Sequence, residues 1–171
     1  MKKDFYIFSD IKGVLNSTLW QKKFKEFELG KQGYFKDVCP DNMEELNILI
    51  KKLSKKYNVK LVITAPWHMN FEKTKKLLVK GGLAYKDEIL FTTPTEQKIR
   101  GLEINEFTEK NNLKGNYVVI DTGVDDVRPY IPAEKIIHPF AEYGLSNTDV
   151  TKYINKHKRL FETAEENIIG E

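Results

Sequence analysis

The feature that most constrains this chain is a short apolar run that stops at a carboxylate. Residues 5–8 are aromatic or β-branched, Asp10 follows them closely, and Gly13 lets the backbone turn away three residues later. Such a run is typical of a buried strand that carries an acidic group at its carboxyl end. Open α/β sheets place their chemistry at that edge. The segment therefore predicts an α/β fold with a candidate site at Asp10.

Two other apolar runs follow the same plan. Residues 60–63 end at Thr64, and residues 117–120 end at Asp121. None of the three runs alternates strictly between polar and apolar residues, as expected of strands buried on both faces of a parallel sheet. Shorter strand candidates cover residues 89–91 and 136–137.

Helical patterns fill the intervals between these strands. Asp41 and Glu44 suggest a capping box for a helix through residue 53, and Ser146 with Asp149 suggests another for a helix through residue 160. Further helices are predicted over residues 71–79, before two glycines, and 100–111. Strands that alternate with helices predict a Rossmann-like three-layer α/β/α sandwich with a mainly parallel sheet.

We expect one domain over residues 1–171. Residues 17–38 mix lysines with aromatic side chains and directly follow the Asp10 turn, so we interpret them as a flap or minimal cap. The flap is either an amphipathic cover whose lysines face water or a nucleic-acid contact surface. Residues 161–171 are expected to be a frayed or loosely docked tail.

Composition narrows the class of protein. The net charge of +3 permits an anionic partner without requiring one. Cys39 is the single cysteine, which excludes an intrachain disulfide, and no apolar run is long enough to cross a membrane. We expect a cytoplasmic protein with no membrane partner.

The strand-end residues suit phosphoryl transfer if the three main strands are neighbours. A carboxylate such as Asp10 can attack phosphorus, a hydroxyl such as Thr64 can bind phosphoryl oxygens, and Asp121 can help to hold Mg²⁺. Arg100 could supply a cation to the same pocket. Asp125 and Asp126 follow Asp121 closely enough to assist with the metal.

Four segments resemble motifs of the haloacid dehalogenase (HAD) superfamily, and more narrowly of its small Swiss-Army-knife RNA-repair-like members. They are IFSDIKGVLN at residues 7–16, LVITAPWH at 61–68, RGLEI at 100–104 and YVVIDTGVD at 117–125. Any one of the four is weak, whereas their shared order and spacing over nearly the whole chain is specific.

The resemblance implies a role for each matching residue. Asp10 would be the nucleophile that forms an aspartyl-phosphate, Thr64 would bind the phosphoryl group, and Arg100 would steady both. Asp10, Asp121 and Asp125 would hold Mg²⁺. At Lys12, however, the family has the aspartate that acts as acid and base, and an ammonium group cannot accept a proton from the attacking water unless its pKa falls by several units.

These considerations lead to two hypotheses. The first is a Mg²⁺-dependent phosphoric monoester hydrolase, slowed or rerouted by Lys12, which acts on a nucleotide, a nucleic-acid end or another bulky phosphorylated substrate. The alternative is an inactive HAD-fold binding or regulatory protein in which Lys12 is ion-paired in the former metal site. A protein partner and the oligomeric state are left open.

Overall fold

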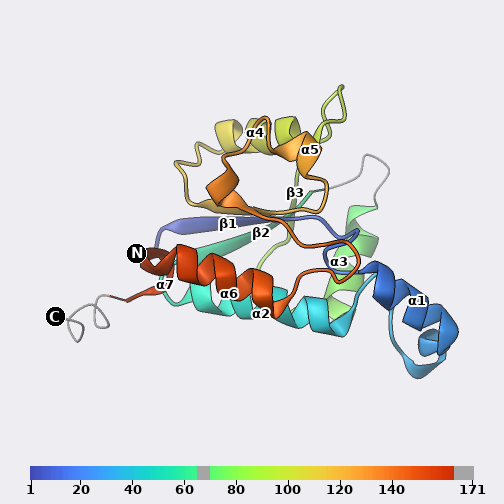
Figure 1. The fold of residues 1–171 in the computed structure, drawn as a ribbon. Coiled ribbons are helices and arrows are strands. Elements are labelled where there is room, and N and C mark those ends of the chain that lie inside the picture. Colours follow the sequence, from blue (N-terminus) through green and yellow to red (C-terminus); the bar gives the residue numbers. More distant parts are fainter. Residues whose placement is uncertain (65–69, 164–171) are drawn as a thin grey trace.

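The computed structural model describes residues 1–64 and 70–163, and its centre is a sheet of five parallel strands (Figure 1). The strands lie in the order β3-β2-β1-β4-β5. Their bounds are β1 Asp4–Ser9, β2 Asn58–Ile63, β3 Leu90–Phe91, β4 Tyr117–Ile120 and β5 Ile136–Ile137. Every strand candidate of the sequence is present, and the parallel α/β prediction is confirmed.

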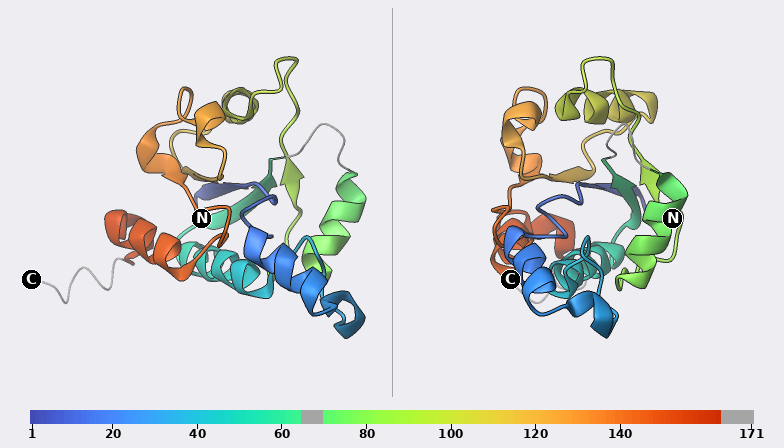
Figure 2. Two further views of the ribbon diagram at one scale, coloured as in Figure 1. Left: turned by 45° about the vertical axis from the view of Figure 1, so that its right-hand side comes forward. Right: turned by 90° about the vertical axis from the view of Figure 1, so that its right-hand side faces the viewer.

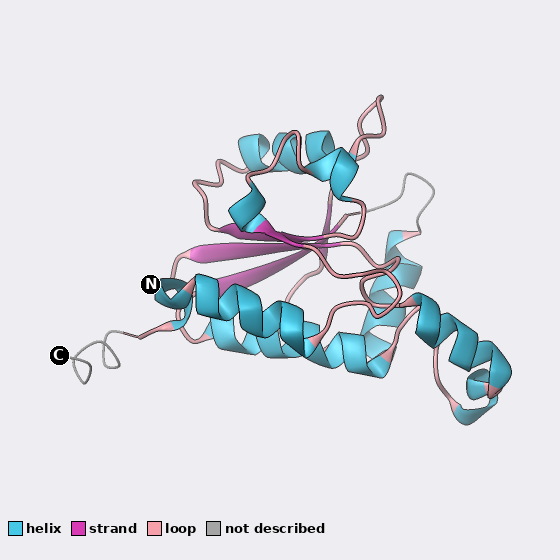
Figure 3. Cartoon of the chain, in the orientation of Figure 1, coloured by secondary structure: helices cyan, strands magenta, loops and turns pink. Residues whose placement is uncertain are grey.

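Helices cover both faces of this sheet, as Figure 2 shows from two other sides and Figure 3 shows in the orientation of Figure 1. One face carries α4 (Arg100–Lys110) and the short α5 (Val124–Val127). The opposite layer contains α2 (Pro40–Ser54), α3 (Phe71–Lys80), α6 (Asn147–Lys156) and α7 (Lys158–Phe161). Two 3-10 turns complete the chain, η1 (Leu29–Gln32) and η2 (Ala133–Lys135).

Alternate residues of the central strands enter two separate hydrophobic cores. On β1, Ile7 belongs to the core beneath α2, α3 and α6, whereas Phe8 belongs to the core beneath α4 and α5. Both side chains are fully buried. The first core includes Leu46, and the second includes Ile104. Burial on both faces explains why these strands read as unbroken apolar runs.

Two helix predictions need correction. The capping box at Asp41 and Glu44 was wrong, because the N-cap is Cys39 and not Asp41. The helix α2 begins at Pro40, which needs no hydrogen bond for its nitrogen at the first helical position. The single helix predicted from Ser146 to residue 160 is interrupted at His157, which leaves the helical region at φ −122° and ψ 42°. The capping box of Ser146 and Asp149 is confirmed.

The segment after the β1 turn forms a helical arm that projects from the body (Figure 1). Its main element is α1 (Thr18–Glu26), which the sequence did not reveal as a helix. The Trp20 indole donates a hydrogen bond to the Phe35 carbonyl (3.0 Å), which closes the arm on itself. The Thr18 N–H donates to the Ala141 carbonyl (2.9 Å), which fixes the base of the arm to the body.

The carboxyl-terminal part of the described chain is packed rather than frayed at Phe161, whose ring meets the Tyr153 ring edge-on at 6.1 Å. Residues 164–171, the rest of the expected tail, lie outside the described residues. None of the helices in the described ranges is both long enough and apolar enough for a membrane crossing.

Candidate active site

The strand register brings three of the predicted side chains to one edge of the sheet. Ser9 is paired with Ile63 on β2 and with Ile120 on β4, so the residues that follow, Asp10, Thr64 and Asp121, leave the sheet at one level. The strand order reverses between β1 and β4, which is where open α/β sheets form a ligand crevice.

A cleft of about 340 Å³ lies at this point. It is lined by the loop after β1, the loop after β4, the start of α4 and the base of the helical arm: Asp10, Lys12, Gly13, Asn16, Thr18, Gln21, Arg100, Asp121, Thr122, Gly123, Asp126 and Ala141. Four of the six predicted site residues, Asp10, Lys12, Arg100 and Asp121, are therefore brought together.

The loop after β1 is held in a tight turn that presents Asp10 to the cleft. The Gly13 N–H donates to Asn16 Oδ1 (2.7 Å), and Gly13 has a φ of +75°, where a side chain is disfavoured. A Cβ at this position would lie 3.1 Å from Thr122 Oγ1. Glycine therefore allows the two loops of the cleft to approach each other closely.

The environment of Asp10 disfavours its ionised form. Its Oδ1 accepts a hydrogen bond from the Ile11 N–H (2.7 Å). Burial raises the pKa of Asp10 to about 6, the negative charge of Asp121 acts in the same direction, and Arg100 opposes both. The site would therefore favour the ionised carboxylate more strongly if a further cation were present.

Asp121 faces the same cleft from β4. Its Oδ1 accepts from the Gly123 N–H (2.7 Å), and its Oδ2 lies 3.8 Å from Arg100 Nε. Burial raises the pKa of Asp121, whereas the Gly123 hydrogen bond and the nearby guanidinium lower it. Asp10 and Asp121 thus share one guanidinium as their cationic neighbour.

Arg100 reaches the cleft because α4 packs very closely on the segment after β4. A Cβ at Gly101 would lie 2.6 Å from the Asp126 carbonyl oxygen and 2.6 Å from the Tyr130 ring. Behind the guanidinium, the buried Glu103 carboxylate lies 3.9 Å from Arg100 Nη1. This Nη1 is buried on the Glu103 side and has no hydrogen-bond partner among the described residues, whereas Nε of the same guanidinium lies toward Asp121 in the cleft.

The other two predicted residues lie differently. Thr64 is buried, does not line the cleft, and its hydroxyl has no hydrogen-bond partner within residues 1–64 and 70–163. The continuation of its motif, residues 65–69, lies outside the described residues. Asp125 is exposed and does not line the cleft, whereas its neighbour Asp126 does.

Lys12 lines the cleft but makes no salt bridge there. Its side chain is exposed, and no ion pair within the described ranges joins it to Asp10 or Asp121. The geometry therefore lacks the internal ion pair on which the inactive alternative depends.

Sequence reasoning missed two contributors to this site. Asn16 fixes the Gly13 turn, and a motif asparagine three residues after a glycine could have signalled it. Glu103 gave no signal, because a glutamate in a polar helix normally faces water, and only the packing of α4 shows that it is buried beside Arg100.

The residues present fit a hard divalent cation. Two carboxylates with raised pKa values face one cleft, and Mg²⁺ is usually held by one or two protein carboxylates together with water and substrate phosphate. No group of three His, Cys, Asp or Glu side chains in the described part of the chain is arranged to bind a metal. The cleft therefore fits a Mg²⁺ ion that two protein carboxylates would hold together with water and a phosphate oxygen of the substrate.

Comparisons with known proteins agree with this geometry. Neither the curated proteins nor the solved structures provide a match to the chain. Residues 6–150, which include all four motifs and every strand after the first two residues of β1, match a family described as the HAD domain in Swiss Army Knife RNA repair proteins. This protein therefore belongs to the HAD superfamily, in the family of HAD domains found in Swiss Army Knife RNA repair proteins.

Proposed function

We propose that this protein is a phosphoric monoester hydrolase that acts through an Asp10 phospho-intermediate. Family membership supports a HAD-type phosphohydrolase. The observation that carries the proposal is the pair Asp10 and Asp121, which share Arg100 across one cleft at the switch point of the sheet. This arrangement provides a nucleophile and positive charge for phosphoryl transfer.

In the first half of the reaction, an Asp10 carboxylate oxygen forms a bond to phosphorus while the bond from phosphorus to the leaving oxygen breaks. Arg100 can offer its guanidinium to the phosphoryl oxygens, because it lines the cleft with its Nε on the side of Asp121. The electron pair of the broken bond stays on the leaving oxygen, which then needs a proton.

Lys12 is suited to supply that proton. An ammonium at the rim of the cleft can protonate the leaving oxygen, and the resulting amine can then take a proton from the water that attacks the aspartyl-phosphate. That attack breaks the bond between phosphorus and the Asp10 oxygen and regenerates the carboxylate. Lysine could thus donate and then recover a proton as the family's aspartate does, passing from a cation to a neutral amine and back.

Mg²⁺, when bound by Asp10 and Asp121, would offset negative charge on the phosphoryl group. Asp125, which the resemblance implies as a ligand, is exposed, and Asp126 is the member of this acidic pair that lines the cleft. We propose that Asp126 assists from the loop after β4.

The openness of the site favours a large substrate. Between β1 and β2 the chain provides the helical arm and α2 but no lid domain. Only Thr18 and Gln21 of the arm line the cleft. We propose a nucleotide or nucleic-acid end as the substrate, since its remaining nucleotides can lie outside the cleft.

A phosphate-release assay tests this function with p-nitrophenyl phosphate, a mononucleotide and an oligonucleotide phosphorylated at either end, each with and without Mg²⁺. We expect Mg²⁺-dependent release that Asp10→Asn abolishes. Asp87→Asn, at an exposed carboxylate outside the four motifs, is the matched control and should retain most of the activity. If the wild type releases no phosphate from any substrate and Lys12→Asp does, the chain is a lapsed enzyme and the hydrolase proposal is wrong.

A further inference from the structure

A second surface, beside the proposed catalytic cleft, is strongly basic. Two adjoining hollows of about 460 and 470 Å³ follow the seam between β5 and the α6–α7 pair, and they share Glu134, Tyr153, Lys156 and His157. We call this seam the basic groove. Six lysines and arginines line it: Arg128, Lys135, Lys152, Lys156, Lys158 and Arg159.

The charge of the groove is uncompensated. Its lining includes only two carboxylates, Glu134 and Asp149, and Asp149 is engaged in the capping box of Ser146. None of the six cations forms a salt bridge with an acid in the described part of the chain. Without Lys158, the groove has five cations and two carboxylates, an excess of three positive charges. This excess equals the net charge of the whole chain, +3, so the remaining residues are neutral on balance.

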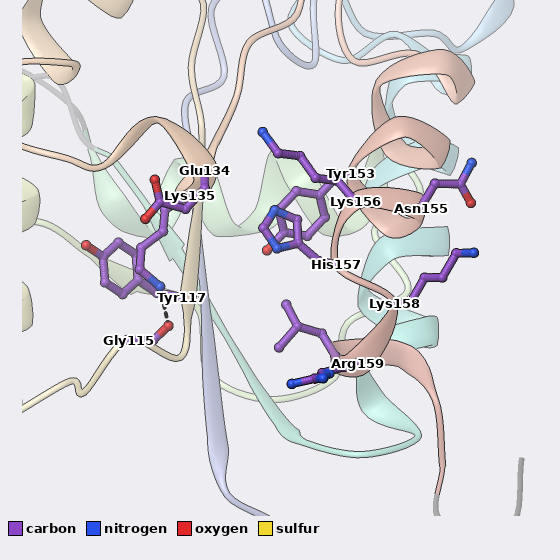
Figure 4. Close-up of a pocket in the computed structure, with 11 residues that line it drawn as sticks. Gly115, Tyr117, Glu134, Lys135, Tyr153, Asn155, Lys156, His157, Lys158 and Arg159 are labelled. Atoms are coloured by element: carbon purple, nitrogen blue, oxygen red, sulfur yellow. Dashed lines mark hydrogen bonds between the residues drawn. The ribbon is translucent and has the colours of Figure 1, made fainter. Parts of the chain in front are cut away.

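Figure 4 shows how these side chains face one another. Lys156, His157 and Arg159 extend from the helical side toward the segment that carries Lys135, at the end of η2, whereas Lys158 points away. His157 Nε2 is buried and has no hydrogen-bond partner within residues 1–64 and 70–163. An anion in the hollow would provide counter-charge for the surrounding cations.

The groove leads to the catalytic cleft. His138, at the near end of the groove, has its Nε2 3.2 Å from the Thr122 carbonyl oxygen, and Thr122 lines the cleft. Phe140 also lines the groove, is 74% exposed, and precedes Ala141 of the cleft. An exposed ring between two phosphate-handling surfaces is suited to stacking on a nucleobase.

The dimensions agree with a strand that spans both sites. The far hollow is lined by Tyr117 at the start of β4, and Asp121 follows its end. Four residues of strand cover about 13 Å at roughly 3.3 Å each. That length corresponds to about four nucleotides at the roughly 3.4 Å rise of one stacked strand.

We propose that the basic groove binds the phosphodiester backbone of a single-stranded nucleic acid, with Phe140 stacked on a base near the cleft. The position of the strand's phosphorylated end at Asp10 rests on the proposed function. The cations hold successive phosphates, and the cleft receives the terminal one. Substrates of four or more nucleotides therefore reach contacts that a mononucleotide cannot.

Binding is tested without catalysis, by fluorescence anisotropy of a labelled ten-nucleotide single strand that lacks a terminal phosphate. The variant is the double substitution Lys156→Ala and Arg159→Ala. The matched controls are Lys51→Ala with Lys52→Ala on α2, and Lys25→Ala with Lys36→Ala on the arm; all of these lysines are exposed. Circular dichroism verifies that each variant is folded.

Loss of two phosphate contacts should weaken binding about 25-fold at 0.1 M salt and lower the salt slope by about 1.4, at about 0.7 per contact for single strands. The α2 control should stay within about twofold of the wild type, and a labelled dinucleotide should not distinguish the groove variant from the wild type. An unchanged affinity in the groove variant, an equal loss in either control, or equally tight binding of polyglutamate would overturn the proposal.

The two proposals fail separately in these measurements. Groove-dependent binding without phosphate release from any substrate would leave the groove in place and remove the hydrolase. Phosphate release could instead show the same kcat/KM for a mononucleotide and a phosphorylated ten-nucleotide strand, in wild type and groove variant alike. That result would support the hydrolase and rule out the groove as a binding site for the strand.

Discussion

Replacement of Asp10 by asparagine should stabilise the metal-free protein at neutral pH. The carboxylate lies in a cleft that raises its pKa to about 6, first through burial and then through the charge of Asp121. Above that pH the folded protein must therefore keep an unfavourable charge. Asparagine retains an oxygen that can accept the Ile11 hydrogen bond and carries no charge.

The magnitude follows from the two pKa values of this side chain. The difference between about 6 in the folded protein and the ordinary value of 3.8 corresponds to about 3 kcal/mol. Because the folded state binds the proton more tightly, the stabilisation by that proton is complete below about pH 3.8 and is lost as the pH rises through about 6. The wild type should therefore lose up to about 3 kcal/mol over this window that Asp10→Asn retains.

Urea unfolding in EDTA at pH 4, 5, 6 and 7.5 measures this difference. At pH 7.5 the midpoint of Asp10→Asn should exceed that of the wild type by up to about 1.5 M, for a slope of about 2 kcal/mol/M. At pH 4 the two should nearly coincide. Asp125→Asn, at an exposed carboxylate, should change stability by less than about 0.5 kcal/mol at any pH.

A gap that does not depend on pH, or an Asp10→Asn variant less stable than the wild type at pH 7.5, would refute the argument that burial and Asp121 strain this carboxylate. Addition of Mg²⁺ gives a second check. It should raise the midpoint of the wild type and leave that of Asp10→Asn nearly unchanged, because a ligand stabilises the state that binds it.

Three further substitutions test other parts of the molecule. Gly101→Ala, whose Cβ would meet the Asp126 carbonyl oxygen at 2.6 Å, should cost about 1–3 kcal/mol in thermal unfolding and lower phosphate release. Asn42→Ala removes the amide that donates to the Tyr143 and Leu145 carbonyls (2.9 and 3.0 Å) and should cost about 2 kcal/mol in urea. Lys12→Met should slow hydrolysis of an alkyl phosphate about 10²–10⁴-fold but that of p-nitrophenyl phosphate far less, since nitrophenolate leaves without a proton; equal losses would exclude Lys12 as the proton donor.

The sheet could be predicted because each strand carries its signal locally. A strand buried on both faces, such as β4, must be apolar throughout, and even the two-residue β5 stands out between prolines. Asp10 and Asp121 lie at the same edge of the sheet because the parallel strands before them, β1 and β4, end in register. The family resemblance supplied the order of the motifs, and the family match bears it out.

What the sequence could not provide depends on tertiary packing. The arm contains a helix, α1, but its mixture of lysines and aromatic rings hides the periodicity, because the rings of Trp20 and Tyr34 pack on each other rather than on the sheet. The choice between Asp125 and Asp126 depends on how the single turn of α5 is rotated over the cleft. Burial of Glu103 depends on how closely α4 approaches.

The attachment of the arm has an evolutionary consequence. Backbone hydrogen bonds from Thr18 and Leu19 to the carbonyls of Ala141 and Glu142 anchor only its first turn (2.9 and 3.1 Å). The outer portion, from residue 22 to 33, lies before Phe35, which packs against the core, and could therefore be lengthened, shortened or exchanged without disturbing the loops of the cleft. Related chains could acquire new target preferences by remodelling that tip alone while the chemistry stays unchanged.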